Sequence, residues 1–285
     1  MAKDNRTLYL LLLPGVGFLL VMFGLPLAMA LLGSFGVGVP GAKAGFSVAA
    51  YQKIFQDPRY VSGLATSLYY GLAPIVVDLM VAIPLSLALS RTFVGRKLFN
   101  GLYKIPLAIP SIVIAFAMLT LFEQGGFLSR LLAHAGLQLP RLVRDPWGVG
   151  VIGAIAWKDV PFMTLIITGG FAAVPSELVY AARALGASRL KAFALVMLPL
   201  SMPGITAAVL LVFIRSIGSF VLPDVLAASF PLPLSVLMYQ AFRESNWPLV
   251  YAIGSILMAA SLAVLMAYYL LSDSLMSRRP AVRNS

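Results

Sequence analysis

Long apolar stretches separated by short polar segments dominate the chain. Membrane-spanning helices need about 20 apolar residues. Six stretches have roughly this length: Leu8 to Leu32, Gly63 to Leu89, Ile105 to Phe122, Val149 to Ala173, Gly204 to Leu226, and Val250 to Leu271. The pattern predicts an all-α, polytopic membrane protein with six transmembrane helices, folded as a single transmembrane domain over residues 1–285.

The first apolar stretch has an alternative interpretation as a signal peptide. Lys3 and Arg6 precede it, and Ala28-Met29-Ala30 is similar to a cleavage site. However, the stretch is longer than the 7–15-residue apolar core of a typical signal. We therefore expect a retained helix.

Composition supports a membrane protein. Hydrophobic residues make up 60% of the chain and charged residues only 11%, with a mean hydropathy of +0.94; soluble domains carry about a quarter charged residues. The net charge of +11 would suggest nucleic acid in a soluble protein. Here the charges fall between apolar stretches, so we expect no nucleic-acid partner. With no cysteine and only His134, the sequence offers no thiolate or histidine cluster for a metal.

Lys and Arg residues set the expected orientation. With both termini inside, twelve of them fall in inner segments and seven in outer segments. Because cytoplasmic loops carry the excess of Lys and Arg, both termini and the segment 175–200 are predicted to be cytoplasmic. Short surface helices are expected on the outer side within 47–60 and 125–136, and a third outer element within 231–247.

The polar segment between Pro175 and Pro203 has its own internal order. Ser176 is expected to cap a helix beginning at Glu177, Gly186 to permit a left-handed turn, and Ser188 to cap a second helix that Pro199 ends. Leu178, Ala181, Ala182 and Leu185 recur at helical spacing and form one smooth apolar face. A stiff helix-turn-helix is one interpretation; an amphipathic connector resting on the membrane is the other.

The spacing of this segment resembles a known family. Ala181-Ala182, Gly186 and Val196-x-Leu198-Pro199 match the cytoplasmic "EAA" loop of ABC importer permeases, written E-A-A-x3-G-x9-I-x-L-P. Tyr180 stands where the family has Glu, which puts that residue's usual ion pair in doubt. The resemblance implies a type I importer permease with the MetI-like fold.

Less specific motifs extend the resemblance over about residues 47–271. Trp157 to Phe162 is similar to the family's Trp-x3-Pro-Phe segment, and Leu107 to Val113 resembles the third span of polyamine, sulfate, phosphonate and ferric-iron permeases. Ser219 to Asp224 and Asn246 to Pro248 resemble the polyamine-type members.

The resemblance implies that this chain acts together with other subunits and catalyses no reaction itself. It implies a second permease subunit that forms a heterodimer with this chain, two ATPase subunits and an extracytoplasmic solute-binding protein at a bacterial inner membrane. ATP and Mg would sit on the ATPase, because the sequence lacks a G-x4-G-K-[ST] phosphate loop, so no enzymatic activity and no cofactor are expected of this chain. The expected ATPase-coupling residues are Glu177, Leu178, Tyr180, Ala181, Ala182, Arg183, Gly186, Ala187 and Ser188.

Ionisable residues within the apolar stretches mark a candidate substrate pathway, since charge at membrane depth usually faces a cavity or a partner. The expected pathway residues are Asp78, Asp159, Arg215, Ser216, Ser219 and Phe220. Arg215 could grip an anionic solute, or it could form a structural ion pair with Asp78 or Asp159. The solute is expected to be small and polar or charged: polyamine-like, a zwitterion, or an anion such as aminophosphonate.

Two other classes of membrane protein are alternative interpretations of the sequence. A secondary transporter or channel often shows inverted repeats, but we find no internal repeat and such a protein leaves the loop unexplained. A membrane-embedded enzyme needs a nucleophile and base within the spans, and no convincing pair is present.

Overall fold

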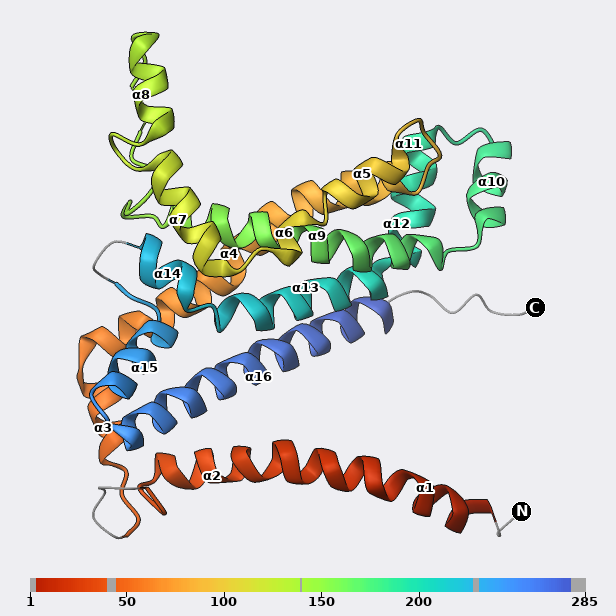
Figure 1. Cartoon of the computed structure of the whole chain (residues 1–285). Helices are drawn as coiled ribbons and strands as arrows, with labels where there is room; N and C mark the ends of the chain where they lie inside the picture. The colour runs from red at the N-terminus through yellow and green to blue at the C-terminus, as the bar shows by residue number, and fades with distance from the viewer. Residues whose placement is uncertain (1–3, 40–44, 139, 228–230, 278–285) are drawn as a thin grey trace. The chain divides into compact units, whose positions relative to one another are not determined.

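The structure is a computed structural model that describes residues 4–39, 45–138, 140–227 and 231–277. All regular elements among these residues are helices (Figure 1). Contacts divide the chain into two compact units, residues 1–61 with 237–285, and residues 62–236. Five basic residues used for the orientation lie outside the described residues: Lys3, Lys43, Arg278, Arg279 and Arg283.

The first unit contains the two terminal spans. The helix α1 (Asp4–Leu19), a π-helical turn (Leu20–Gly24) and α2 (Leu25–Ser34) follow one another, and α3 (Ala49–Gln56) and α16 (Trp247–Ser277) complete the unit. The helices α2 and α16 pack closely, because a Cβ added to Gly33 would lie 2.5 Å from the ring of Tyr251. The Tyr51 hydroxyl donates to Ser34 Oγ at 2.8 Å and ties α3 to the end of α2.

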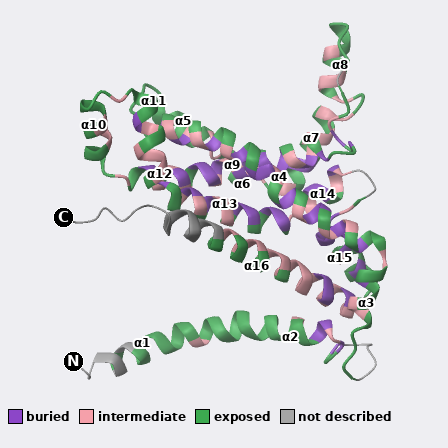
Figure 2. Ribbon diagram, turned by 180° about the vertical axis from the view of Figure 1, so that it is seen from behind, coloured by how far each residue is buried: buried purple, intermediate pink, exposed green. Residues whose placement is uncertain are grey.

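The second unit is built around α9. Its elements are α4 (Pro58–Leu89, from residue 62 on), α5 (Arg96–Leu102), α6 (Ile105–Ala108), α7 (Ser111–Phe122), α8 (Phe127–His134), α9 (Val149–Ala172), α10 (Ser176–Ala184), α11 (Arg189–Ala192), a π-helical turn (Phe193–Met197), α12 (Leu198–Leu200), α13 (Met202–Ile217) and α14 (Val221–Leu226). The helix α15 (Leu234–Arg243) crosses the boundary between the units. Buried residues concentrate on α9 and α13 (Figure 2).

The membrane-spanning pattern differs from the sequence prediction in two places. Among the described residues, five helices are long and apolar enough to span a membrane, and a sixth span appears if Arg189–Leu200 and Met202–Ile217, bent by 66°, count as one. The predicted stretch Ile105 to Phe122 breaks at Ile109, which is extended (φ −84°, ψ 127°) because the following Pro110 disfavours the helical conformation. The predicted stretch Gly204 to Leu226 breaks after Ile217, at Gly218 and Ser219, where glycine gives helix little support.

Each segment expected on the outer side contains a helix, although α8 also falls within the candidate span Ser111–His134, which extends beyond the predicted end at Phe122. The helix α3 lies within 47–60, α8 within 125–136 and α15 within 231–247. In the second unit, α8 and α14 lie at one end, whereas α10 and α11 lie at the opposite end (Figures 1 and 2).

The start of α9 is fixed by a side chain. The Asp145 carboxylate, only 6% exposed, accepts hydrogen bonds from the backbone N–H groups of Trp147 (3.1 Å), Val149 (2.9 Å) and Gly150 (3.3 Å). These are unpaired amides at a helix N-terminus, where a negative charge is favourable. Asp145 therefore anchors the central helix of the unit.

Close backbone packing joins α9 to α13 and yields a first prediction. A Cβ added to Gly204 would lie 2.9 Å from the Cα of Gly170, and small residues allow such approaches between membrane helices. Gly204→Val is expected to separate the two helices and to lower the apparent Tm of the detergent-solubilised protein by several degrees. Gly153→Ala, where no neighbouring atom lies within 4 Å of the new Cβ, is the matched control. An equal Tm for Gly204→Val and wild type would contradict this packing.

Candidate functional site

The candidate site begins with α10, which follows the central helix. Pro175 is extended (φ −58°, ψ 126°) and α10 begins at Ser176. The predicted capping by Ser176 is wrong: its hydroxyl lies in the first turn and bonds the Glu177 carboxylate at 3.3 Å instead of a backbone amide. Glu177 does lie in the first turn, where its charge favours the helix.

Two opposite faces of α10 have different environments. Leu178, Ala181, Ala182 and Leu185 lie on one side at helical spacing. Leu178 is 46% exposed and Leu185 is 89% exposed, so the described residues leave this face largely uncovered. Ser176, Val179, Tyr180 and Arg183 lie on the other side and line a cavity. Tyr180, which replaces the usual Glu, therefore belongs to the cavity side.

The turn after α10 has the geometry that the sequence predicts. Gly186 has φ +91°, in the left-handed region. Its N–H donates to Arg183 O at 3.0 Å, and the Ala187 N–H donates to Ala182 O at 3.1 Å. This pair of bonds is a Schellman motif, which satisfies the last carbonyls of the helix. Ser188 then caps α11 by accepting from the Lys191 N–H at 3.2 Å, as predicted.

The second helix of the loop is longer than predicted. Helical structure runs from Arg189 through the π-helical turn to Leu200, so Pro199 does not end it. Pro199 occupies the first turn of α12, immediately after the π-helical turn, whose widened bonding pattern accommodates a residue without an N–H. The chain then bends by 66° into α13.

Aromatic packing joins this second helix to the end of α9. The rings of Phe171 and Phe193 meet edge to face with centroids 5.8 Å apart, and Ala192 is 1% exposed. With the Schellman turn and the Ser188 cap, these contacts make the segment 176–200 a braced elbow. This elbow consists of α10, the turn at Gly186 and the helical segment Arg189–Leu200.

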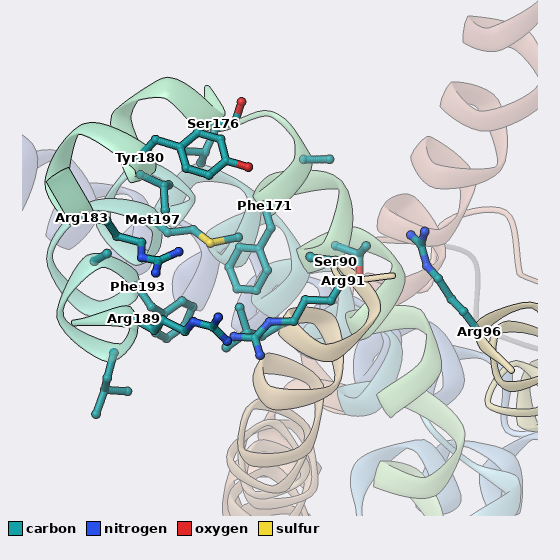
Figure 3. Close-up of a pocket in the computed structure, with 17 residues that line it drawn as sticks. Ser90, Arg91, Arg96, Phe171, Ser176, Tyr180, Arg183, Arg189, Phe193 and Met197 are labelled. Atoms are coloured by element: carbon teal, nitrogen blue, oxygen red, sulfur yellow. The ribbon is translucent and has the colours of Figure 1, made fainter. Parts of the chain in front are cut away.

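A cavity of about 830 Å³ lies between the elbow and the ends of α4 and α9 (Figure 3). Its polar wall includes Arg91, Arg96, Arg183 and Arg189, and its apolar wall includes Phe171, Phe193 and Met197. The sequence predicted a coupling role for Arg183, whereas Arg91, Arg96 and Arg189 served only as orientation signals. Their convergence depends on how the elbow folds back, which spacing alone does not indicate.

The intramembrane charges form a second cluster. Arg215 Nη2 lies 3.2 Å from Asp159 Oδ1, and Ser216 Oγ donates to Asp159 Oδ2 at 3.2 Å. The Arg215 guanidinium also lies over the Phe162 ring, 4.7 Å from its centroid. The pair is unequally exposed, because the Asp159 side chain is 6% exposed and the Arg215 side chain 41%. Arg215 therefore pairs with Asp159, one of the two partners considered from sequence.

The remaining predicted pathway residues lie on α4 and in the break after α13. Asp78 in α4 is fully buried, and neither carboxylate oxygen has a hydrogen-bond partner among the described residues. Ser219 and Phe220 lie in the break between α13 and α14, where the Ser219 carbonyl accepts from Ser235 Oγ at 2.7 Å. Lys158 bonds Ser111 and links α9 to α7. Within the described residues, no cluster of metal-ligating side chains occurs.

Comparison with known proteins places these features among transport proteins. Residues 80–278 match the family model "Binding-protein-dependent transport system inner membrane component". The chain is similar to the sulfate transport system permease CysT of Escherichia coli, at 28% identity over 78% of this chain and 80% of CysT. It is also similar to the molybdate/tungstate permease WtpB of Pyrococcus abyssi (27%; 93% and 95% covered) and the trehalose permease SugA of Mycobacterium tuberculosis (27%; 73% and 68% covered).

Solved structures share the fold. A chain of a bacterial ABC transporter involved in the import of the acidic polysaccharide alginate superposes with a TM-score of 0.78 at 18% identity, covering 98% of this chain and 97% of that chain. A chain of the inward-facing MetNI methionine ABC transporter gives 0.58 at 18% identity, covering 76% and 98%. At these identities the likeness concerns the fold alone.

Proposed function

The chain belongs to the family of binding-protein-dependent transport system inner membrane components, and we infer that it forms half of a solute pathway that a separate ATPase opens. It is a permease subunit of an ABC importer, a multi-pass membrane protein with the MetI-like fold. Beyond this family membership, we propose how the chain couples to ATP hydrolysis on a separate ATPase and which class of solute it transports.

One observation carries the coupling proposal: the uncovered apolar face of α10 on a braced elbow. Alanines at Ala181 and Ala182 let a partner approach closely, and Leu178 and Leu185 flank them as exposed anchors. A rigid protrusion transmits displacement, and the Phe171–Phe193 contact connects the elbow to α9. We propose that the ATPase docks on this face from the cytoplasm, where both chain termini also lie.

The remaining partners follow from this role. The proposal includes a second permease subunit, two ATPase subunits that hold ATP and Mg, and a solute-binding protein on the outer side. One solved relative of similar fold is the alginate transporter in complex with a pentasaccharide-bound periplasmic protein. In this chain the corresponding outer elements would be those around α8 and α14, at the end of the second unit opposite α10.

The exposure of the intramembrane charges favours an anionic or zwitterionic solute over a polyamine. Arg215 presents a partly exposed guanidinium, whereas Asp159 and Asp78 are buried. A solute entering the pathway therefore meets the cation first, and guanidinium groups bind carboxylates and other oxyanions in a two-pronged geometry. The sulfate and molybdate/tungstate permeases among the relatives carry oxyanions by name, while SugA is named for neutral trehalose.

Co-purification tests the coupling proposal. The importer purified through a tag on this chain is expected to contain an ATPase whose hydrolysis rises when loaded solute-binding protein is added. Leu185→Glu places a charge on one of the two exposed leucines of the docking face and is expected to reduce ATPase recovery at least about tenfold, as for an interface hot spot. Leu131→Glu, at a 55% exposed leucine of α8, is the control. Equal recovery for both variants, or no ATPase with wild type, would contradict docking on α10.

A further inference from the structure

The cavity behind α10 is an additional candidate binding site. It is lined by seventeen residues, of which four are arginines and none is Asp or Glu. Among the described residues, none of these arginines forms an ion pair or a side-chain hydrogen bond. Figure 3 shows Arg91, Arg183 and Arg189 directed toward the same space, with Arg96 to one side. Several unpaired guanidinium groups facing one cavity favour a multivalent anion, particularly one with phosphate oxygens.

The cavity is separate from the proposed docking face. The cavity side of α10 carries Ser176, Val179, Tyr180 and Arg183, and it is opposite the side that carries Leu178 and Leu185. An ATPase on the docking face would therefore leave the cavity unfilled. Both surfaces can be occupied at once.

The cavity also has an apolar wall at the helix ends. Leu87 belongs to the last turn of α4, and Phe171 and Ala172 end α9, so this wall lies where two spanning helices leave the membrane. Phe193 and Met197 extend it onto the elbow. A ligand that combines a negative headgroup with a hydrocarbon chain fits this combination better than an acidic protein segment, which would leave the apolar wall uncovered.

We propose that this cavity binds the phosphate headgroup of an anionic phospholipid from the cytoplasmic leaflet, with its acyl chain along the apolar wall. Basic pockets between membrane helices on the cytoplasmic side are known to hold such headgroups. The proposal relies on the cytoplasmic location of the elbow, which is part of the proposed function. A lipid in this position bridges α4, α9 and the elbow, and so makes coupling sensitive to the lipid composition of the membrane.

The test uses the whole importer, purified through a tag on this chain, with phosphatidylglycerol as the probe. Binding is measured by native mass spectrometry during titration with phosphatidylglycerol, phosphatidylcholine or soluble glycerol phosphate. The test variant combines Arg91→Gln and Arg189→Gln. The matched control combines Lys97→Gln and Lys191→Gln, which removes the same charge from α5 and α11 without altering the cavity lining.

Wild type and the lysine control are expected to bind phosphatidylglycerol in preference to phosphatidylcholine. The arginine variant is expected to bind phosphatidylglycerol about twenty-fivefold more weakly, from about fivefold for each of the two basic residues near a charged headgroup. Equal binding by the two double variants would overturn the proposal, as would saturation by glycerol phosphate alone. Loss of the ATPase from the arginine variant with lipid binding intact would assign the cavity to an acidic protein segment. Absence of the ATPase from wild type would contradict the proposed function instead.

Discussion

Replacing Gly186 with valine is expected to abolish solute uptake while leaving membrane insertion intact. Gly186 has φ +91°, and a left-handed conformation costs an L-residue roughly 1–2 kcal/mol, with β-branched residues the least tolerant. No neighbouring atom lies within 4 Å of a Cβ added there, so the expected effect comes from the backbone and not from crowding. The Schellman turn would open, and α10 would lose its fixed angle to Arg189–Leu200.

Uptake of radiolabelled solute and the amount of protein in the membrane measure the two effects separately. Gly186→Asn is the matched control, because asparagine adopts the left-handed conformation more readily than other non-glycine residues. It is expected to retain most of the uptake. Normal uptake by Gly186→Val would show that the elbow does not need its fixed turn.

The second large effect is expected at the Arg215–Asp159 pair. Arg215→Met removes the ion-pair partner of the buried Asp159 carboxylate and leaves it the hydrogen bond from Ser216. Removing one partner of a fully buried pair costs 3–5 kcal/mol. Because the Arg215 side chain is 41% exposed, solvent screening reduces the expected loss of unfolding free energy to about 1–3 kcal/mol.

A double-mutant cycle separates a structural pair from a pathway residue. Arg215→Met combined with Asp159→Leu removes both charges and is expected to recover most of the stability, measured by thermal unfolding in detergent. Uptake by this double variant is expected to stay at least about tenfold below wild type, because the exposed cation in the pathway is missing. Full recovery of both stability and uptake would assign the pair a purely structural role.

The local structure of the elbow was accessible from sequence because its signals are local. Gly186 and Ser188 act on backbone groups within three or four residues, so the left-handed turn and the second cap follow from residue type and position. The prediction failed at Ser176 and Pro199, where neighbouring backbone decided the outcome. Pro175 already serves as the boundary of α10, and a π-helical turn carries the second helix past Pro199.

For the membrane spans, too, local signals were predictable from sequence and changes of backbone direction were not. Apolar length identified most of them, but the breaks at Ile109 and Gly218 interrupt stretches that are predominantly apolar on both sides of the break. Hydropathy does not register a change of backbone direction that leaves the side chains apolar. The pairing of Arg215 with Asp159, 56 residues apart, and the direction of Arg91, Arg183 and Arg189 toward one cavity depend on tertiary packing and needed the structure.

Site-specific cross-linking tests whether the ATPase docks on α10 from the cytoplasm. The chain contains no cysteine, so a single Leu185→Cys on the uncovered face of α10 and a single Leu131→Cys on α8 can each be read without background. In inner-membrane vesicles the Leu185→Cys variant is expected to cross-link to the ATPase with a yield that changes with ATP, whereas the Leu131→Cys variant is expected not to cross-link to it. Labelling of position 185 only from the outer side of the membrane, or cross-links to the ATPase from 131 alone, would contradict this docking.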